Sequence, residues 1–155
     1  MTSKNGKKEG WIEVLLEDCV AILDSKRIPV NAGERAKRIK GKSRSELYPY
    51  YGATGEVGLI DDFIFEGEHL LIGEDGAPFF DKTKNVAFVV KEKFWVNNHA
   101  HILKAFDSVT SNRYLSHYLN QFDYKGFVGG STRLKLNQAS MKKIPVSLPS
   151  LSTQH

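Results

Sequence analysis

The sequence predicts an α+β fold: a single compact domain with a twisted, mostly antiparallel sheet, a few short helices and long loops. Short runs of aromatic and branched residues alternate with turn formers between residues 48 and 105, which is typical of antiparallel strands. Helix-like periodicity and a glycine-rich loop dominate the residues that follow. A length of 155 residues suits one domain with a core of its own.

The N-terminal part of the chain contains three kinds of segment. Residues 1–10 are basic and polar, and we expect a flexible tail there. Residues 11–23, WIEVLLEDCVAIL, fit either one amphipathic helix or a strand, one helical turn and a second strand. Residues 24–49 contain eight Lys/Arg, Pro29 and few apolar residues, so we expect a long, exposed, irregular segment.

The middle of the chain predicts six strands joined by short turns. Between the first two strands, GATG predicts a β-turn, because glycine tolerates the positive φ that such turns need. The strands are expected in YPYYG, EVGLI, HLLIG, VAFVV, FWV and AHILKA.

The last third of the chain predicts two helices and a closing strand. TSNRYLSHYLNQF has apolar residues at four-residue spacing, and Thr110 or Ser111 is a suitable N-cap. After a glycine-rich loop, NQASMKKI predicts a short helix capped by Asn137. PVSLPSL predicts a strand ended by prolines, so the domain is expected to span residues 11–151, with a tail at 152–155.

Charge is distributed unevenly, although the net charge is only +4. Residues 1–44 carry 11 Lys/Arg against 6 Asp/Glu, and residues 45–81 carry 9 acids and no Lys or Arg. Residues 124–155 carry 5 basic residues and no acid. Such a chain can present a positive face suited to a polyanion, unless the charges interleave in the fold.

Motifs for enzyme chemistry are incomplete. GKS at 41–43 lacks the earlier glycine of a phosphate-binding loop, and GATGEVG leads into a strand rather than a helix. His99 and His101 would share one face of a strand, but no further ligands lie at a helpful spacing, so we expect no metal site. Asp75 in GEDG is better explained by a turn than by a catalytic carboxylate. No nucleophile elbow is present, and no cofactor is expected.

Composition also bounds the compartment. Cys19 is the single cysteine, which excludes an internal disulfide and fits a buried, unreactive thiol. No apolar run approaches the roughly 20 residues of a membrane span, and no signal-peptide core follows the basic N-terminus. We therefore expect a cytoplasmic protein without membrane contact.

The best single binding candidate is GGSTRLKLNQ at residues 129–138. Its glycines allow close approach of the backbone, Ser131 and Thr132 offer hydroxyls, and Arg133 and Lys135 offer positive charge. Arginine can bind guanine O6 and N7, and lysine and backbone amides can hold phosphates. A solvated loop that caps the last helix explains the same residues equally well.

Three segments in this order and at this spacing carry a family resemblance: YYGATGEVGLIDDFIFEGEHLLIGEDGA, FWVNNHAHILK and GGSTRLKLNQASMKKIPVSLPSL. Together they resemble a target recognition domain of the specificity (S) subunit of type I restriction–modification systems, from about Trp11 to Leu151. The resemblance implies an α+β domain whose loops enter the DNA major groove. It also implies that the domain has no catalytic activity, because methyltransferase (M) and restriction (R) subunits do the chemistry.

The resemblance also implies partners and site residues. Double-stranded DNA and the M subunit are expected partners, together with the R subunit. NNHAHIL is expected to be a family strand motif whose polar residues make structural hydrogen bonds near the recognition loops. The residues expected to contact DNA are Arg35, Arg38, Lys40, Lys42, Arg44, Tyr51, Thr54, Lys82, Lys84, Ser131, Thr132, Arg133 and Lys135.

One departure from the family pattern concerns the number of domains. A complete S subunit has two recognition domains, each reading half of a split target, with long helices between them, whereas this sequence predicts one. The chain is therefore expected to be a half-subunit, a natural truncation or a piece of a longer protein, and two copies pairing to mimic a full subunit is one alternative. A second function stays open, a protein–protein adaptor that binds a methyltransferase without reading DNA. An unrecognised small enzyme is disfavoured because no nucleophile, base and orienting group occur together.

Overall fold

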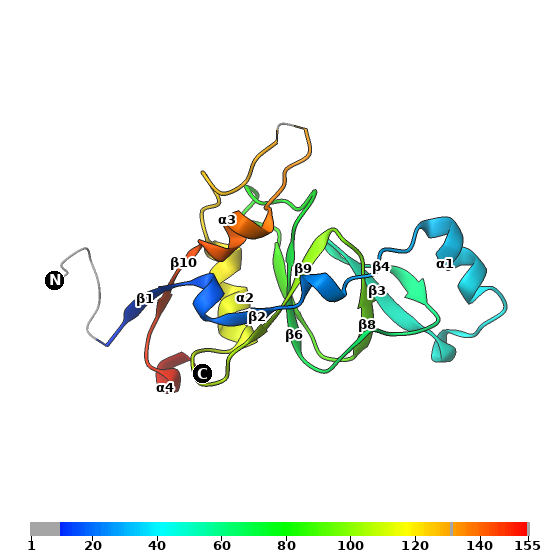
Figure 1. Cartoon of the computed structure of the whole chain (residues 1–155), viewed down its shortest axis with the longest axis horizontal. Helices are drawn as coiled ribbons and strands as arrows, with labels where there is room; N and C mark the ends of the chain where they lie inside the picture. Colours follow the sequence, from blue (N-terminus) through cyan, green and yellow to red (C-terminus); the bar gives the residue numbers. More distant parts are fainter. Residues whose placement is uncertain (1–9, 131, 155) are drawn as a thin grey trace.

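The computed structural model describes residues 10–130 and 132–154. In that part of the chain the strands form three sheets along an elongated molecule (Figure 1). The helix α1 (Ala32–Ile39) lies at one end, and β1 (Ile12–Leu15) and α4 (Leu151–Gln154) lie near the other. No helix among the described residues is long and apolar enough to cross a membrane.

The three sheets use strands that are far apart in the sequence. The first pairs β1 with β10 (Pro145–Leu148). The second has the order β2 (Val20–Ile22), β9 (Ala100–Ala105), β6 (His69–Gly73) and β7 (Ala87–Val90). The third has the order β4 (Gly55–Ile60), β3 (Tyr48–Gly52), β8 (Lys93–Val96) and β5 (Phe65–Glu66). Every strand pairing in the described part is antiparallel except that of β3 with β8, so the predicted class and the mostly antiparallel pairing are confirmed.

Strand β6 of the second sheet is buried on both faces, which is why Leu70, Leu71 and Ile72 are all apolar rather than alternating with polar residues. Leu70 and Ile72 pack with Leu115 of α2 (Asn112–Gln121), which covers one face. Leu71 points the other way and packs with Phe94 of the third sheet. Sequence reasoning missed β5, whose two residues are too few for a recognisable pattern.

Residues 11–23 form two strands with one helical turn between them. The turn, η2 (Leu16–Asp18), moves the chain from the first sheet, where β1 pairs with β10, to the second, where β2 pairs with β9. Buried Leu16 fixes this turn against the core. The strand–turn–strand alternative is therefore confirmed.

Most of residues 24–49 are exposed as expected, although Asp24 is buried, but the expectation of an irregular segment is wrong. The segment holds η3 (Asp24–Lys26), α1 and η4 (Arg44–Glu46). Asn31 caps α1 by accepting a hydrogen bond from Glu34 N at 2.8 Å. None of the residues of α1 is buried, so the apolar stripe that normally reveals a helix in a sequence is missing.

The remaining turns and caps follow the sequence prediction. The β3–β4 hairpin turns at residues 53–54, and Gly55 has the positive φ of +136°. Ser111 caps α2 and Asn137 caps α3 (Gln138–Lys142). All six predicted strands are present, including the two that form the predicted hairpin.

Candidate nucleic-acid interface

Four loops that are distant in the sequence meet at one part of the surface, which we call the four-loop face. It consists of residues 53–54 between β3 and β4, 74–85 after β6, 97–99 before β9, and the described residues 129–130 and 132–136 before α3. Backbone hydrogen bonds join three of these loops. Glu74 N donates to His99 O at 2.8 Å, and Gly76 N donates to Leu134 O at 2.7 Å. The loops are therefore fixed to one another rather than independent.

The turn at 53–54 lies beside the segment after β6. Gly73 is required there, because a Cβ at this position would collide with Ala77 Cβ and also come within 3.2 Å of Ala53 O. A hollow of about 550 Å³ opens between the two loops, lined by Thr54, Gly76, Pro78, Lys84 and Asn85. The fold thus brings together Thr54 and Lys84, which are 30 positions apart in the sequence.

A buried hydrogen-bond network centred on His101 supports the four-loop face from below. His101 Nδ1 bonds to Asp24 Oδ2 at 2.6 Å, and Nε2 bonds to Leu136 O at 2.7 Å. An ionised Asp24 and the Leu136 carbonyl can only accept hydrogen bonds, so both ring nitrogens of His101 donate in this arrangement. Asp24 also accepts hydrogen bonds from Ile102 N at 2.9 Å and Gln138 Nε2 at 3.1 Å. The network fastens the end of the 129–136 loop to β9.

The electrostatics of this network favour a charged Asp24. Burial by itself would raise the pKa of Asp24, but the hydrogen bond and charge of His101 and the bond from Ile102 N outweigh it, so the pKa is lowered. Glu74 forms an ion pair with Arg27, whose Nη1 lies 2.5 Å from Glu74 Oε1 and 3.0 Å from Ala100 O. Two carboxylates are thus balanced by two cations of the chain itself.

The same residues are the candidate metal ligands within the described part of the chain. Asp24, Glu74 and His101 place one ligand atom each within 4.8 Å of one another. A metal here would have to replace the hydrogen bond between His101 Nδ1 and Asp24 and the ion pair between Arg27 and Glu74. The expectation that no metal is bound stays a prediction, and the cluster is explained by its hydrogen bonds.

Residues 129–130 and 132–136 form the two sides of a hairpin loop. Gly129 and Lys135 exchange backbone hydrogen bonds of 3.0 and 2.9 Å. Gly130 has φ of +96°, and a Cβ there would collide with Arg133 O, so this turn needs glycine. Arg133 near the tip is 61% exposed, and its Nε donates to Asp75 Oδ1 at 2.6 Å. Also exposed are Thr132 and Lys135, whereas Ser131 lies outside the described residues.

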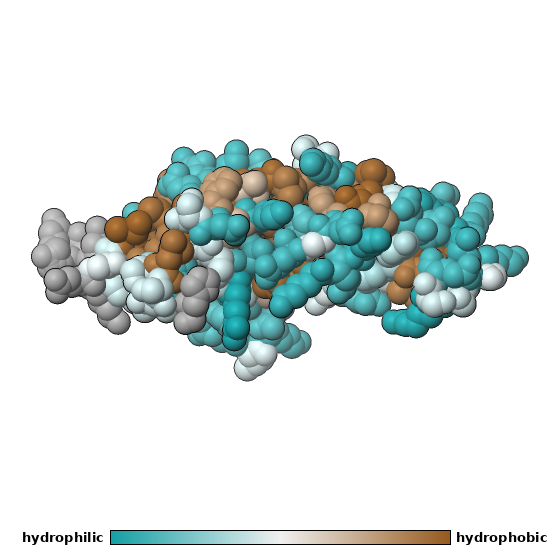
Figure 2. All heavy atoms as spheres, turned by 90° about the horizontal axis from the view of Figure 1, so that it is seen from below, coloured by the Kyte–Doolittle hydropathy of each residue, from teal (hydrophilic) through white to brown (hydrophobic). Residues whose placement is uncertain are grey.

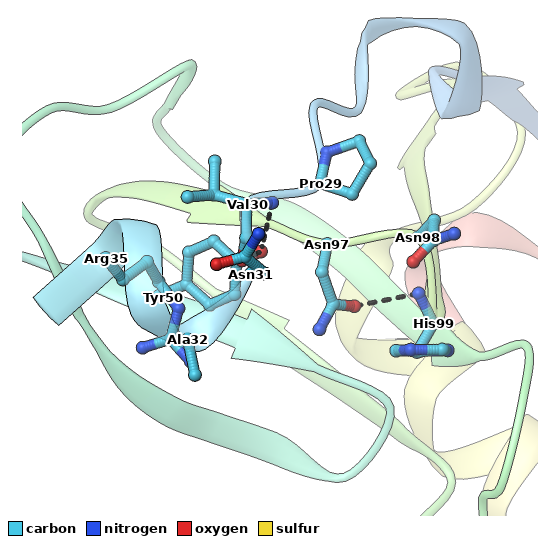
Figure 3. Close-up of a pocket in the computed structure, with 9 residues that line it drawn as sticks. All are labelled: Pro29, Val30, Asn31, Ala32, Arg35, Tyr50, Asn97, Asn98 and His99. Carbon is cyan, nitrogen blue, oxygen red and sulfur yellow. Dashed lines mark hydrogen bonds between the residues drawn. The ribbon is translucent and has the colours of Figure 1, made fainter.

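A second hollow, of about 440 Å³, lies between the start of α1 and the turn 97–99 (Figure 3). The hydroxyl of Tyr50 donates to Val30 O and accepts from Val30 N, both at 3.0 Å, which holds the segment before α1 against β3. On the opposite side, Asn97 Oδ1 accepts a hydrogen bond from His99 N at 2.7 Å. Polar side chains from two distant segments therefore border one cavity next to the four-loop face.

His99 and His101 have different surroundings, although they are two residues apart. The side chain of His101 is fully buried in the network, which confirms the expected structural hydrogen bonding. His99 precedes β9 and its side chain is 39% exposed, with Nδ1 3.5 Å from Asp75 Oδ2. One histidine therefore supports the face and the other belongs to it.

Comparison with known protein families connects this geometry to a function. A sequence model described as the type I restriction modification DNA specificity domain matches residues 8–155. This chain belongs to that family. The specificity domain is also 33% identical over 139 residues to a protein named as a type I restriction enzyme specificity subunit from Haemophilus influenzae, covering 90% of this chain and 33% of the relative.

Other relatives agree on the fold. The EcoprrI specificity subunit of Escherichia coli is 24% identical over 116 residues, covering 75% of this chain and 27% of that protein. A crystal structure of an S subunit from M. genitalium matches with a TM-score of 0.72 at 12% identity, covering 97% of this chain and 37% of that one. The HsdS subunit of Thermoanaerobacter tengcongensis gives 0.61 at 13% identity, with 96% and 36% covered. The specificity domain thus spans about a third of the length of the relatives that it matches.

The two arginines of α1 that were expected to contact DNA are held by the domain itself. The Arg35 guanidinium lies 4.4 Å above the centre of the Tyr50 ring, and Gly58 leaves room for it. Arg38 lies 5.0 Å above the ring of Trp95 and donates to Asp61 Oδ1 at 2.7 Å. Both arginines attach α1 to the third sheet, and their contact with DNA stays a prediction.

The lysines of the same region are arranged differently. Lys40 and Lys42 are exposed, and no side-chain hydrogen bond or ion pair of theirs is found within residues 10–130 and 132–154. Arg44 is 77% exposed and lies 3.8 Å from Glu56 Oε2. Figure 2 shows the end of the domain that carries α1 as predominantly hydrophilic. Phosphate contact by Lys40, Lys42 and Arg44 is compatible with these positions and stays a prediction.

Two further predicted contacts have structural roles. The Tyr51 hydroxyl donates to Glu92 Oε2 at 2.6 Å, and its ring meets Phe94 edge-on. Burial and the neighbouring Glu92 raise the pKa of Tyr51. Lys82 Nζ donates to the carbonyls of Gln121 and Phe122 at 2.8 and 2.7 Å, which caps the C-terminal end of α2.

Sequence reasoning missed Asp75 and Asn85 as members of the face. The chain bends at Glu74 and Gly76, and Asp75 between them forms a bridge with Lys135. The role of Asp75 in holding Arg133 depends on a contact 58 residues away. The sequence does contain a hint of this role for Asp75. The residue precedes a glycine in an acidic segment, and such an acid can form an ion pair with a basic loop. Only the fold shows which basic residue it meets.

Proposed function

We propose that the specificity domain reads a short base sequence in double-stranded DNA and thereby directs the methyltransferase and restriction subunits of a type I system to one half of a bipartite site. The observation that carries this proposal is the four-loop face. It gathers exposed donors and acceptors from four distant segments and stands on a buried charged network. Base readout needs such fixed polar groups, because hydrogen bonds to base edges discriminate only when their geometry is held.

The proposal assigns two kinds of DNA contact. Arg133, Thr132 and Thr54 face the bases, and Lys135 and Lys84 lie beside them on the same face. Lys40 and Lys42 hold phosphate, which supplies affinity but carries no sequence information. No catalytic step is assigned to the domain, because the buried carboxylate of Asp24 and the half-buried carboxylate of Glu74 are committed to His101 and Arg27.

A second recognition unit is part of the proposal, because the relatives are about three times longer than this chain. That unit belongs either to another part of a longer protein or to a second copy. The domain by itself would then read one half-site, and methyltransferase binding would place two half-sites at a fixed separation.

Selection of bound sequences from a random duplex pool tests the proposal, with and without a cognate methyltransferase subunit. A short enriched motif with the domain alone would support an independent reader. Enrichment only with the methyltransferase subunit would mean that reading needs the assembled complex. No enrichment in either case, together with methyltransferase binding that does not depend on DNA, would favour the adaptor function instead.

Salt dependence separates the two functions independently. DNA binding through several phosphates should weaken steeply as salt concentration rises, with a slope of about −0.9 per phosphate contact in a double-logarithmic plot. An adaptor that binds only protein would not follow this relation with DNA.

A further inference from the structure

The guanidinium of Arg133 is bonded to one carboxylate and lies over a glycine. Its Nε donates to Asp75 Oδ1 at 2.6 Å. The guanidinium passes over Gly76, where a Cβ would be 3.5 Å from Nη2 and 3.6 Å from Cζ, so the glycine leaves room for it. Gly76 has φ of +81°, a backbone conformation that other residues rarely adopt. A long and normally mobile side chain is thus given one orientation while it stays 61% exposed.

The hydrogen bond to Asp75 does not use the terminal nitrogens of the Arg133 guanidinium. The carboxylate accepts from Nε, and within the described residues neither Nη1 nor Nη2 has a hydrogen-bond partner. Two terminal nitrogens in a fixed plane form the fork that matches the O6 and N7 atoms of guanine in the major groove. A lysine at this position would offer the charge but not the fork.

Asp75 itself is fixed by its surroundings. Its backbone N donates to His99 O at 3.3 Å, and its Oδ2 lies 3.5 Å from His99 Nδ1. It also forms a bridge with Lys135 at the base of the hairpin that carries Arg133. The acceptor and the donor are therefore placed by the same pair of loops, so the ion pair has little freedom to rearrange.

An exposed ion pair of this kind contributes little to folding stability, because solvent screens it and ordering the side chains costs entropy. The same ordering helps binding. An arginine that is already oriented loses less conformational freedom when it meets a base than a free one does. The arrangement is thus better suited to recognition than to stability.

We infer that Asp75 is a specificity-determining positioning residue, which orients Arg133 so that its terminal nitrogens read a guanine in the target. This inference rests on the proposed function and names one base class within the site. Asp75 does not contact the base in this arrangement, and it acts through Arg133.

The test compares two variants that each remove one negative charge. Asp75→Asn removes the orienting carboxylate. Glu56→Gln removes an exposed carboxylate that lies 3.8 Å from Arg44 and is not part of the four-loop face. Both changes strengthen the general attraction to DNA, so a difference between them reports position rather than charge. Sequence selection and direct binding are measured with the 155-residue chain, with and without methyltransferase subunit.

The expected result is a change at one base pair of the selected motif. Arg133→Ala should abolish a guanine preference of about five- to 150-fold there. Asp75→Asn should reduce the preference at that same position by about two- to fivefold, the range expected from an exposed ion pair. Glu56→Gln should leave the preference unchanged, and Asp75→Asn should have no further effect on it in the Arg133→Ala background. A merely structural role of Asp75 would weaken binding equally at all positions.

Other results would overturn the inference. If the Asp75→Asn variant keeps the full guanine preference, or binds all sequences more tightly by the same factor, then Asp75 only shields Arg133 from DNA. Arg133→Lys provides a second test that does not touch Asp75, and retention of the preference by this variant would exclude readout by the fork. A motif that contains no guanine sensitive to Arg133 would overturn the inference and leave the proposed function standing. No enriched motif with the unaltered chain under either condition would overturn both.

Discussion

The α1 region and the four-loop face are both exposed and basic, yet the fold treats their charges in opposite ways. In the α1 region the arginines Arg35 and Arg38 are fixed against aromatic rings, and the lysines extend into solvent. In the four-loop face one arginine, Arg133, is fixed by a carboxylate and still presents its end. The difference teaches that positive charge by itself does not separate residues that build the domain from residues that can read DNA.

The support beneath the two regions also differs. The four-loop face stands on the buried network of Asp24, His101 and Leu136, whereas none of the residues of α1 is buried. A face that must hold several polar groups in register needs such a base. A region that only attracts phosphate can tolerate movement, because electrostatic attraction depends weakly on exact geometry.

The largest expected effect comes from removing the base of the four-loop face. Asp24→Ala leaves the charged His101 and the Ile102 amide buried without their partner. Loss of one member of a buried ion pair typically costs about 3–5 kcal/mol, so we expect a decrease of that size in the free energy of unfolding. Urea denaturation followed by circular dichroism measures it. A decrease below about 1 kcal/mol, the value of an ordinary exposed pair, would contradict the buried network.

Acid should weaken the same network in the unaltered protein. The pKa of Asp24 is lower in the folded protein than in the unfolded chain, so the folded state favours the ionised form. Its contribution is present above the ordinary pKa of 3.8 and is lost as the pH falls through the lower folded value. Asp24→Asn should flatten this part of the stability curve, measured by denaturation from neutral pH downward. An unchanged curve would assign the acid sensitivity to other groups.

Arg133→Ala tests the four-loop face at the residue that is proposed to contact a base. We expect a loss of about 1–3 kcal/mol in binding to the best DNA sequence and a relaxed preference at one position, with folding stability nearly unchanged. Fluorescence anisotropy with the best duplex and with a set of single-base variants measures both effects. An equal loss on all sequences would reduce Arg133 to a phosphate contact.

Arg38→Ala should have the reverse pattern. The side chain is 27% exposed and joins α1 to Trp95 and Asp61, so its removal should lower stability by about 1 kcal/mol. Base preference should not change, because the residue lies outside the four-loop face. Thermal denaturation and the anisotropy series together decide the matter, with Lys37→Ala on the same helix as a control of equal charge change.

The smallest effect on stability is expected for Lys40→Ala and Lys42→Ala, within about 0.5 kcal/mol, as for other exposed surface positions. If each lysine contacts one phosphate, each substitution should lower the steepness of the salt dependence by about 0.9 without changing the selected motif. Lys104→Ala, an exposed lysine on β9, controls for the loss of charge. An equal change of the salt slope in all three variants would mean that only net charge matters.

Local patterns predicted most of the fold but little of the site. The six strands, the hairpin turn and the caps Ser111 and Asn137 depend on residues within a few positions of one another, so the sequence reveals them directly. The sequence did not reveal helix α1, because its stabilising contacts, to Tyr50 and Trp95, lie outside its own segment. Of the predicted contacts, Tyr51 and Lys82 illustrate the same limit, since their partners are 41 and 39 or more residues away.

By itself the sequence determined the α+β class, the order of the strands, the basic and acidic segments and the family to which they point. These follow from periodicity, turn chemistry and residue order, which are properties of the chain read in one direction. Only the tertiary structure decided which charges pair. Asp24 meets His101 across 77 residues and Asp75 meets Arg133 across 58, and such contacts exist only because the sheets bring those segments together. A pairing of this kind is a matter of position in space, and no local pattern encodes it.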